Sequence, residues 1–141
     1  WATILGQELD GIRLFNEEKL WPNEEFASVL LVVRTKYLEN NPETVQKWVE
    51  SHEKTVTWIN SNPNKSKSLF SNFLIDYMGK SLPTKIIDES FSNISITSDP
   101  IKNSVIIFAE RADSLGYLGR SGYNLDGIFY DTVLNVNNGD L

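Results

Sequence analysis

The stretch Phe26–Pro63, FASVLLVVRTKYLENNPETVQKWVESHEKTVTWINSNP, decides the fold that we expect of this chain. It opens with a run of five apolar residues, Val29–Val33, which is too short to span a membrane and is rich in β-branched side chains. A run of this kind, closed by Arg34, predicts a strand that is buried on both faces.

The second half of the stretch predicts the longest helix of the chain, over 41–60, after a short helical turn at 36–40. Asn41 is a favourable N-cap, and Pro42 at the first helical position loses no hydrogen bond that it could have made. One face of this helix carries Val45, Trp48, Val49, His52, Val56 and Ile59. The opposite face is charged or polar, so the sequence predicts an amphipathic helix.

Proline and glycine place the other helices. Asn62-Pro63, Leu82-Pro83 and Asp99-Pro100 mark three further helix starts, and Gly79 and Gly116 mark two helix ends. The remaining expected elements are a short strand at 12–15, a brief strand or extended link at 94–97, and a closing helix at 128–136. Helices with few strands predict an α/β fold whose sheet is small or is completed by chain outside this sequence.

Bulk properties exclude several classes of site. The chain has 141 residues, about one domain, and its net charge of −6 without clustered Lys or Arg argues against a nucleic-acid or anionic-membrane surface. It has no cysteine and one histidine, which excludes disulfides, thiolate zinc and multi-histidine metal sites within it. It begins with Trp1 and has no signal peptide, from which we expect a processed product or a fragment.

The residues that could carry catalysis favour structural roles. His52 lies on the apolar helix face, where a packed histidine is the favoured interpretation, because a general base needs a carboxylate partner and a cleft. The pairs Glu17-Glu18 and Glu24-Glu25 are adjacent in sequence, so their side chains point apart and predict an acidic surface. We therefore expect neither enzymatic activity nor a cofactor or metal.

Two tryptophans leave a choice open. Trp21 precedes Pro22 in a predicted loop beside the apolar run, and Trp1 opens the chain. Each side chain could wall a ligand cleft, or it could anchor its segment on the core.

Several short motifs, in their order and spacing, resemble the later half of substrate-binding proteins of ABC importers. They are Trp1-Ala2-Thr3, Val33-Arg34, Tyr37-Leu38, Asn41-Pro42, Trp58-Ile59-Asn60-Ser61-Asn62-Pro63, Phe108–Arg111, Leu115–Arg120 and Gly122–Phe129. The resemblance is to the nitrate/sulfonate/bicarbonate/taurine group, and to its aliphatic-sulfonate-binding branch in particular.

This resemblance implies a two-lobe fold of the type II periplasmic-binding-protein kind, of which the chain is the C-terminal half. Residues 1–25 would end the second lobe and approach the hinge, and 26–141 would form the crossover strand and the helical C-terminal part of the first lobe. The implied ligand-binding residues are Trp1, Phe26, Ala27 and Ser28, with Trp21 as a weaker candidate.

The implied function is capture of a small anion, such as an aliphatic sulfonate, outside the cell membrane and its delivery to permease subunits. A lipid anchor would lie upstream, and no nucleic acid is expected as a partner. The alternatives are an enzyme or binder of thiamine-precursor pyrimidines on the same scaffold, and a helical interaction domain unrelated to transport. Because an uncovered strand exposes its edges, we also expect dimerisation or strand exchange if the chain stands alone.

Overall fold

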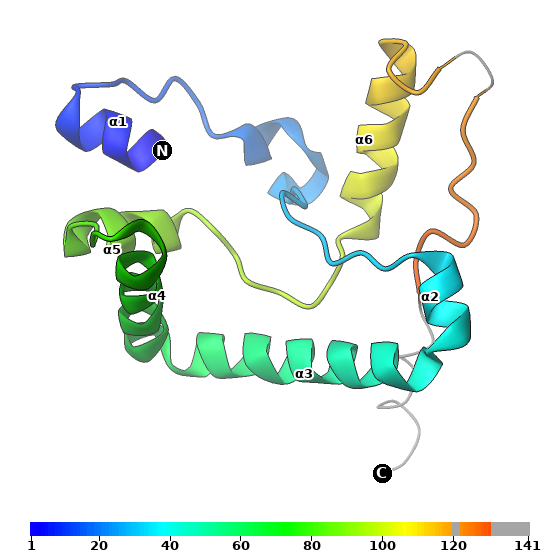
Figure 1. The fold of residues 1–141 in the computed structure, drawn as a ribbon. Helices are drawn as coiled ribbons and strands as arrows, with labels where there is room; N and C mark the ends of the chain where they lie inside the picture. Colours follow the sequence, from blue (N-terminus) through cyan, green and yellow to red (C-terminus); the bar gives the residue numbers. More distant parts are fainter. Residues whose placement is uncertain (120–121, 131–141) are drawn as a thin grey trace. The chain divides into compact units, whose positions relative to one another are not determined.

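The computed structural model describes residues 1–119 and 122–130, and these residues are all-α (Figure 1). The elements are α1 (Ala2–Glu8), the 3₁₀ turns η1 (Glu17–Leu20) and η2 (Pro22–Glu24), α2 (Thr35–Asn40), α3 (Pro42–Ser61), α4 (Pro63–Met78), α5 (Thr84–Ser92) and α6 (Lys102–Ser114). No described residue belongs to a strand. The expected α/β class, and with it the predicted portion of a two-lobe α/β fold, is therefore wrong.

The apolar run accounts for most of this error. Residues 30–34 have no regular secondary structure, Val29 lies at a bend, and these residues form no ladder with any described segment. Val29 is 89% exposed and Val32 is 79% exposed, where a strand buried on both faces was expected. Burying apolar side chains is favourable, but this alone does not form a strand. A strand forms only where a neighbouring strand pairs with its backbone N–H and C=O groups. The predicted strand at 12–15 fails for the same reason, and 94–97 is a link without regular secondary structure rather than a strand.

The predicted starts of the two longest helices and the end of the second are confirmed, because proline and glycine act locally. α3 and α4 begin at Pro42 and Pro63 as predicted. α4 ends before Gly79, which takes the left-handed conformation (φ 73°) and donates its N–H to Ile75 O at 2.8 Å.

The asparagines before the prolines act differently from the prediction. Asn41 donates its side-chain amide to Tyr37 O (3.1 Å), and Asn62 donates to Trp58 O (2.9 Å). In each pair the acceptor lies four residues back, in the preceding helix. These side chains therefore close one helix rather than cap the next.

α6 begins two residues later than Pro100 suggests. Ile101 has a positive φ of 48°, and its N–H donates to Asp99 Oδ1 at 2.8 Å. This turn delays the first helical residue to Lys102. Of the predicted closing helix, residues 128–130 are not helical and the rest lies outside the described residues.

The chain forms two compact units, each built from two stretches: 1–15 with 52–98, and 16–51 with the residues from 99 onward. The expected boundary between residues 25 and 26 falls inside the second unit, and that domain assignment stays a prediction.

The first unit packs α1 and α4 against α5, and Figure 1 shows α4 beside α5. Ile86 and Ile87 of α5 are buried. Lys67 and Asp88 form an ion pair of 2.7 Å between α4 and α5, and the rings of Phe70 and Phe91 meet edge to face. These contacts explain why a helix of nine residues is held in place.

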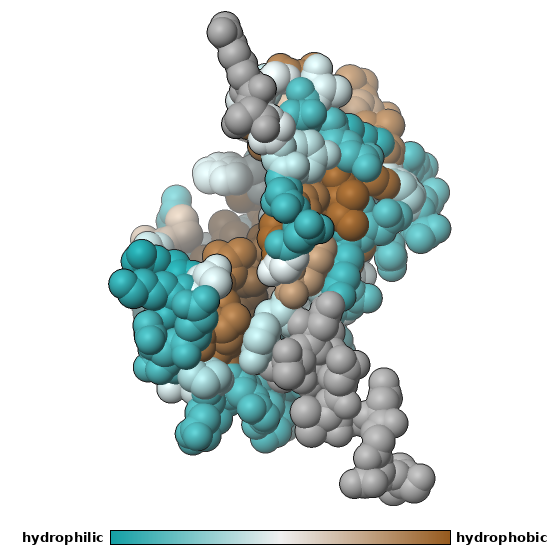
Figure 2. Space-filling model, turned by 90° about the vertical axis from the view of Figure 1, so that its right-hand side faces the viewer, coloured by the Kyte–Doolittle hydropathy of each residue, from teal (hydrophilic) through white to brown (hydrophobic). Residues whose placement is uncertain are grey.

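Many large apolar side chains stay at the surface, and Figure 2 shows hydrophobic patches between hydrophilic ones. In the part of the chain that the structure describes, no helix is long and apolar enough to cross a membrane.

Candidate ligand pocket

An aromatic cluster in the second unit takes in two of the predicted site residues. We call Trp21, Phe26, Phe108 and Arg111 the Trp21 cluster. The Trp21 ring lies 4.5 Å from the Phe26 ring and 6.1 Å from the Phe108 ring, centroid to centroid. The Arg111 guanidinium lies 4.4 Å from the Trp21 ring and donates to Leu20 O at 2.9 Å. Trp21 is only 7% exposed, so this side chain anchors its loop on α6.

A buried serine holds the next residue against the same helix. Ser104 of α6 is 2% exposed; its hydroxyl accepts from Ala27 N–H at 3.1 Å and donates to Ile101 O at 3.0 Å. Ser28, the next residue in the chain, is exposed. The Trp21 indole N–H is buried and has no acceptor among the described residues.

The structure thus brings together Trp21, Phe26 and Ala27, and places Ser28 directly after them. Trp1 belongs to the other unit, where it is exposed at the start of α1. The three residues that meet are packed against α6, and they are not among the residues that line the cavity described next. Ligand binding by any of the five predicted site residues stays a prediction.

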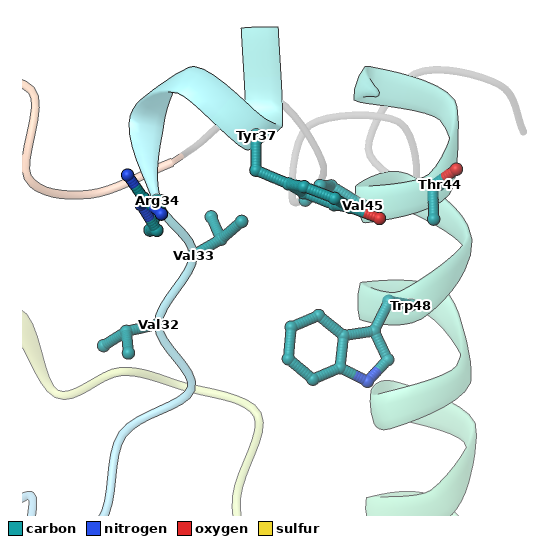
Figure 3. Close-up of a pocket in the computed structure, with 7 residues that line it drawn as sticks. All are labelled: Val32, Val33, Arg34, Tyr37, Thr44, Val45 and Trp48. Atoms are coloured by element: carbon teal, nitrogen blue, oxygen red, sulfur yellow. The ribbon is translucent and has the colours of Figure 1, made fainter. Parts of the chain in front are cut away.

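A cavity of about 380 Å³ lies elsewhere in the same unit, where the apolar run enters α2 and α3 (Figure 3). Its lining residues come from the end of the run and the first turns of the two helices: Val32, Val33, Arg34, Tyr37, Thr44, Val45 and Trp48.

Local backbone geometry assembles this pocket. Tyr37 N–H donates to Arg34 O at 2.9 Å, and Asn41 N–H donates to Tyr37 O at 2.9 Å, so α2 is a tight turn between the run and α3. In Figure 3 the Tyr37 ring extends towards Val45, and the Trp48 ring extends from α3 towards the apolar run. Val45 is 2% exposed, whereas the faces of Tyr37 and Trp48 stay half-exposed.

The chemistry of the pocket is mixed. Arg34 is the one charged residue among the seven that line it, and Tyr37 and Thr44 add hydroxyl groups. In the described parts of the chain, no ion pair neutralises the Arg34 guanidinium. The other walls are apolar. A guanidinium binds oxyanions through paired donors, and apolar walls favour hydrocarbon.

The seven residues that line the pocket include no histidine, cysteine or carboxylate. His52 lies further along α3, half-buried and outside the lining residues. The described residues contain no cluster of three potential metal ligands. In the same unit, lost hydration and then the charges of Glu110 and Asp113 raise the pKa of the Tyr123 phenol above its ordinary 10.0.

Sequence reasoning missed the pocket residues for a definite reason. From the sequence, Arg34 was interpreted only as the end of a strand, and Trp48 was assigned to the apolar face of a helix. The usable signal was a cation directly after an apolar run, followed fourteen residues later by Trp48 on the next long helix. That signal becomes a pocket only once the turn of α2 is known.

The chain was compared with known proteins at three levels, and no family model, curated protein or solved structure matches it.

Proposed function

We propose that this chain serves as a solute-binding component of an ABC importer, outside the cytoplasmic membrane, and that it captures a small anion such as an aliphatic sulfonate for delivery to permease subunits. Two features support the proposal. One is the ordered set of motifs from Trp1-Ala2-Thr3 to Gly122–Phe129, and the other is the chemistry of the Arg34 pocket.

The observation that carries the proposal is the pairing of one guanidinium with apolar walls in a single cavity. An alkanesulfonate has the complementary form: a singly charged head with three acceptor oxygens, and a hydrocarbon tail. Arg34 can offer two parallel N–H donors to the head. Val33, Val45 and Trp48 can cover the tail, and each methylene removed from water contributes about 0.8 kcal/mol.

The same chemistry ranks the anions of the wider group. Nitrate and bicarbonate have no tail, so they would use Arg34 but leave the apolar walls unused. Taurine would place an ammonium group against those walls, where burying an unpaired charge is costly. We therefore expect affinity to rise with alkyl chain length.

Calorimetric titration of the chain with methane-, butane- and hexanesulfonate tests the proposal. Affinity should rise about fourfold per methylene, the factor that corresponds to the transfer free energy of one methylene. Inorganic sulfate should bind more weakly than any of the longer sulfonates.

Arg34→Gln should weaken sulfonate binding about tenfold or more, because it removes a charge-assisted hydrogen bond. Lys36→Gln is the matched control, since Lys36 is exposed in α2, carries the same charge and does not line the pocket. Equal losses in the two variants would contradict binding at this pocket. Binding of thiamine-precursor pyrimidines in place of sulfonates would support the alternative function.

A further inference from the structure

Two aromatic side chains of the Arg34 pocket, Tyr37 and Trp48, have ring surface that is free to contact a ligand. Both residues line the cavity, and each is 49% exposed. In the parts of the chain that the structure describes, neither ring contacts another aromatic ring. Trp21 differs, because it stacks on Phe26 and is 7% exposed. The pocket thus combines a guanidinium with unstacked aromatic surface.

The cavity has room for a small organic ring beside Trp48. Its volume of about 380 Å³ falls within the range of roughly 300–1,000 Å³ that is typical of sites for small organic molecules. The apolar run contributes Val32 and Val33 to the lining, and α3 contributes Val45 and Trp48. In Figure 3 the run and α3 face each other across the pocket, and the Trp48 ring extends towards the run. A planar group in this space can lie against the indole, with valine side chains around it.

The chemistry of an arenesulfonate matches both parts of the pocket. A sulfonate group withdraws electrons from the aromatic ring that carries it, whereas the indole of tryptophan is electron-rich. Because aromatic rings interact through their quadrupoles, an electron-poor ring stacks favourably on an indole. An alkyl tail gains from burial alone, and it also loses rotational freedom that a rigid ring does not have.

We propose that the Arg34 pocket binds arenesulfonates with the aromatic ring against Trp48, and that Trp48 is the residue that favours an aromatic tail over an aliphatic one. This inference rests on the proposed sulfonate-binding function and names the class of sulfonate. Arg34 holds the anionic head through its N–H donors, and the ring replaces solvent on the exposed face of Trp48.

Calorimetric titration of the chain with benzene-, cyclohexane- and hexanesulfonate tests the inference. The three ligands have the same head group and six carbons each, so they differ in the aromaticity and the rigidity of the tail. A cyclohexane ring is more hydrophobic than a benzene ring, so the informative quantity is the change in each affinity when Trp48 is replaced.

Trp48→Leu removes the indole but keeps an apolar side chain at this position of the pocket. The loss of affinity should be about two- to tenfold greater for benzenesulfonate than for cyclohexanesulfonate, because only the aromatic ligand loses a stacking partner. Trp48→Phe keeps an aromatic ring and should restore most of this difference.

Trp58→Leu is the matched control. Trp58 lies on the same helix and is 40% exposed, but it does not line the pocket. This variant should bind both ring sulfonates as tightly as the wild-type chain does.

Equal losses for benzenesulfonate and cyclohexanesulfonate in Trp48→Leu would overturn the inference. So would a wild-type chain that binds hexanesulfonate but not benzenesulfonate. Both results would leave sulfonate binding at Arg34 intact, so they are distinct from a failure of the proposed function. If none of the three sulfonates binds, the proposed function fails and the inference fails with it.

Discussion

Residues 21–27 and residues 28–33 are neighbours in the chain, and both carry large apolar side chains, but these side chains have opposite environments. Trp21 and Phe26 stack with Phe108 of α6 and are covered, while Val29 and Val32 are open to solvent. The difference is the presence of a partner. α6 supplies two aromatic contacts and a serine hydroxyl to the first stretch, and no described element supplies a ladder to the second.

The largest expected effect is the loss of stability on truncating Trp21. Trp21→Ala should lower the free energy of unfolding by about 3–5 kcal/mol, because it removes a buried aromatic side chain and leaves a cavity. Urea unfolding followed by circular dichroism measures this change. Val29→Ala should stay within about 0.5 kcal/mol of wild type, because its side chain is exposed.

The second effect concerns the hydrogen bond that ties the first stretch to α6. Ser104→Ala should cost about 2 kcal/mol, because the part-buried Ala27 N–H loses its acceptor. Ser114→Ala is the control on the same helix: its hydroxyl donates to Arg111 O but is exposed, so a change of a few tenths of a kcal/mol is expected. Similar losses in both variants would show that the bond to Ala27 contributes little.

The smallest effect is expected at the exposed member of the Trp21 cluster. Arg111→Met should cost about 1 kcal/mol through loss of the cation–π contact and the bond to Leu20 O. Arg111→Lys keeps the charge but not the planar donor geometry, and it should recover only part of the loss. Full recovery by lysine would mean that charge alone matters at this site.

The comparison also shows which features the sequence could predict. The helices follow from proline and glycine, whose effects on the backbone are local, and Pro42, Pro63 and Gly79 act as expected. The prediction of a strand at Val29–Val33 was wrong because an apolar pattern indicates that side chains favour burial, but it does not identify the strand with which the backbone would pair. Asn41 and Asn62 were misassigned because an asparagine between two helices can bond to either one.

The pocket and the Trp21 cluster depend on contacts that pattern alone does not encode. Trp21 meets Phe108 across more than eighty residues, so the choice between cleft wall and anchor could not be made from its proline-containing loop. Arg34, Tyr37 and Trp48 come together only because α2 turns within six residues. The sequence shows the types of these residues, but not the distances between them in the folded chain.

Hydrogen exchange of individual backbone amides tests most directly whether the two stretches differ as described. In dilute protein, the amides of Trp21, Glu24, Glu25 and Ala27 should be protected, because each has an acceptor. Those of residues 28–33 should exchange at the rate of an unstructured peptide. Protection of residues 28–33 equal to that of Ala27 would contradict the description of residues 28–33 as an uncovered stretch.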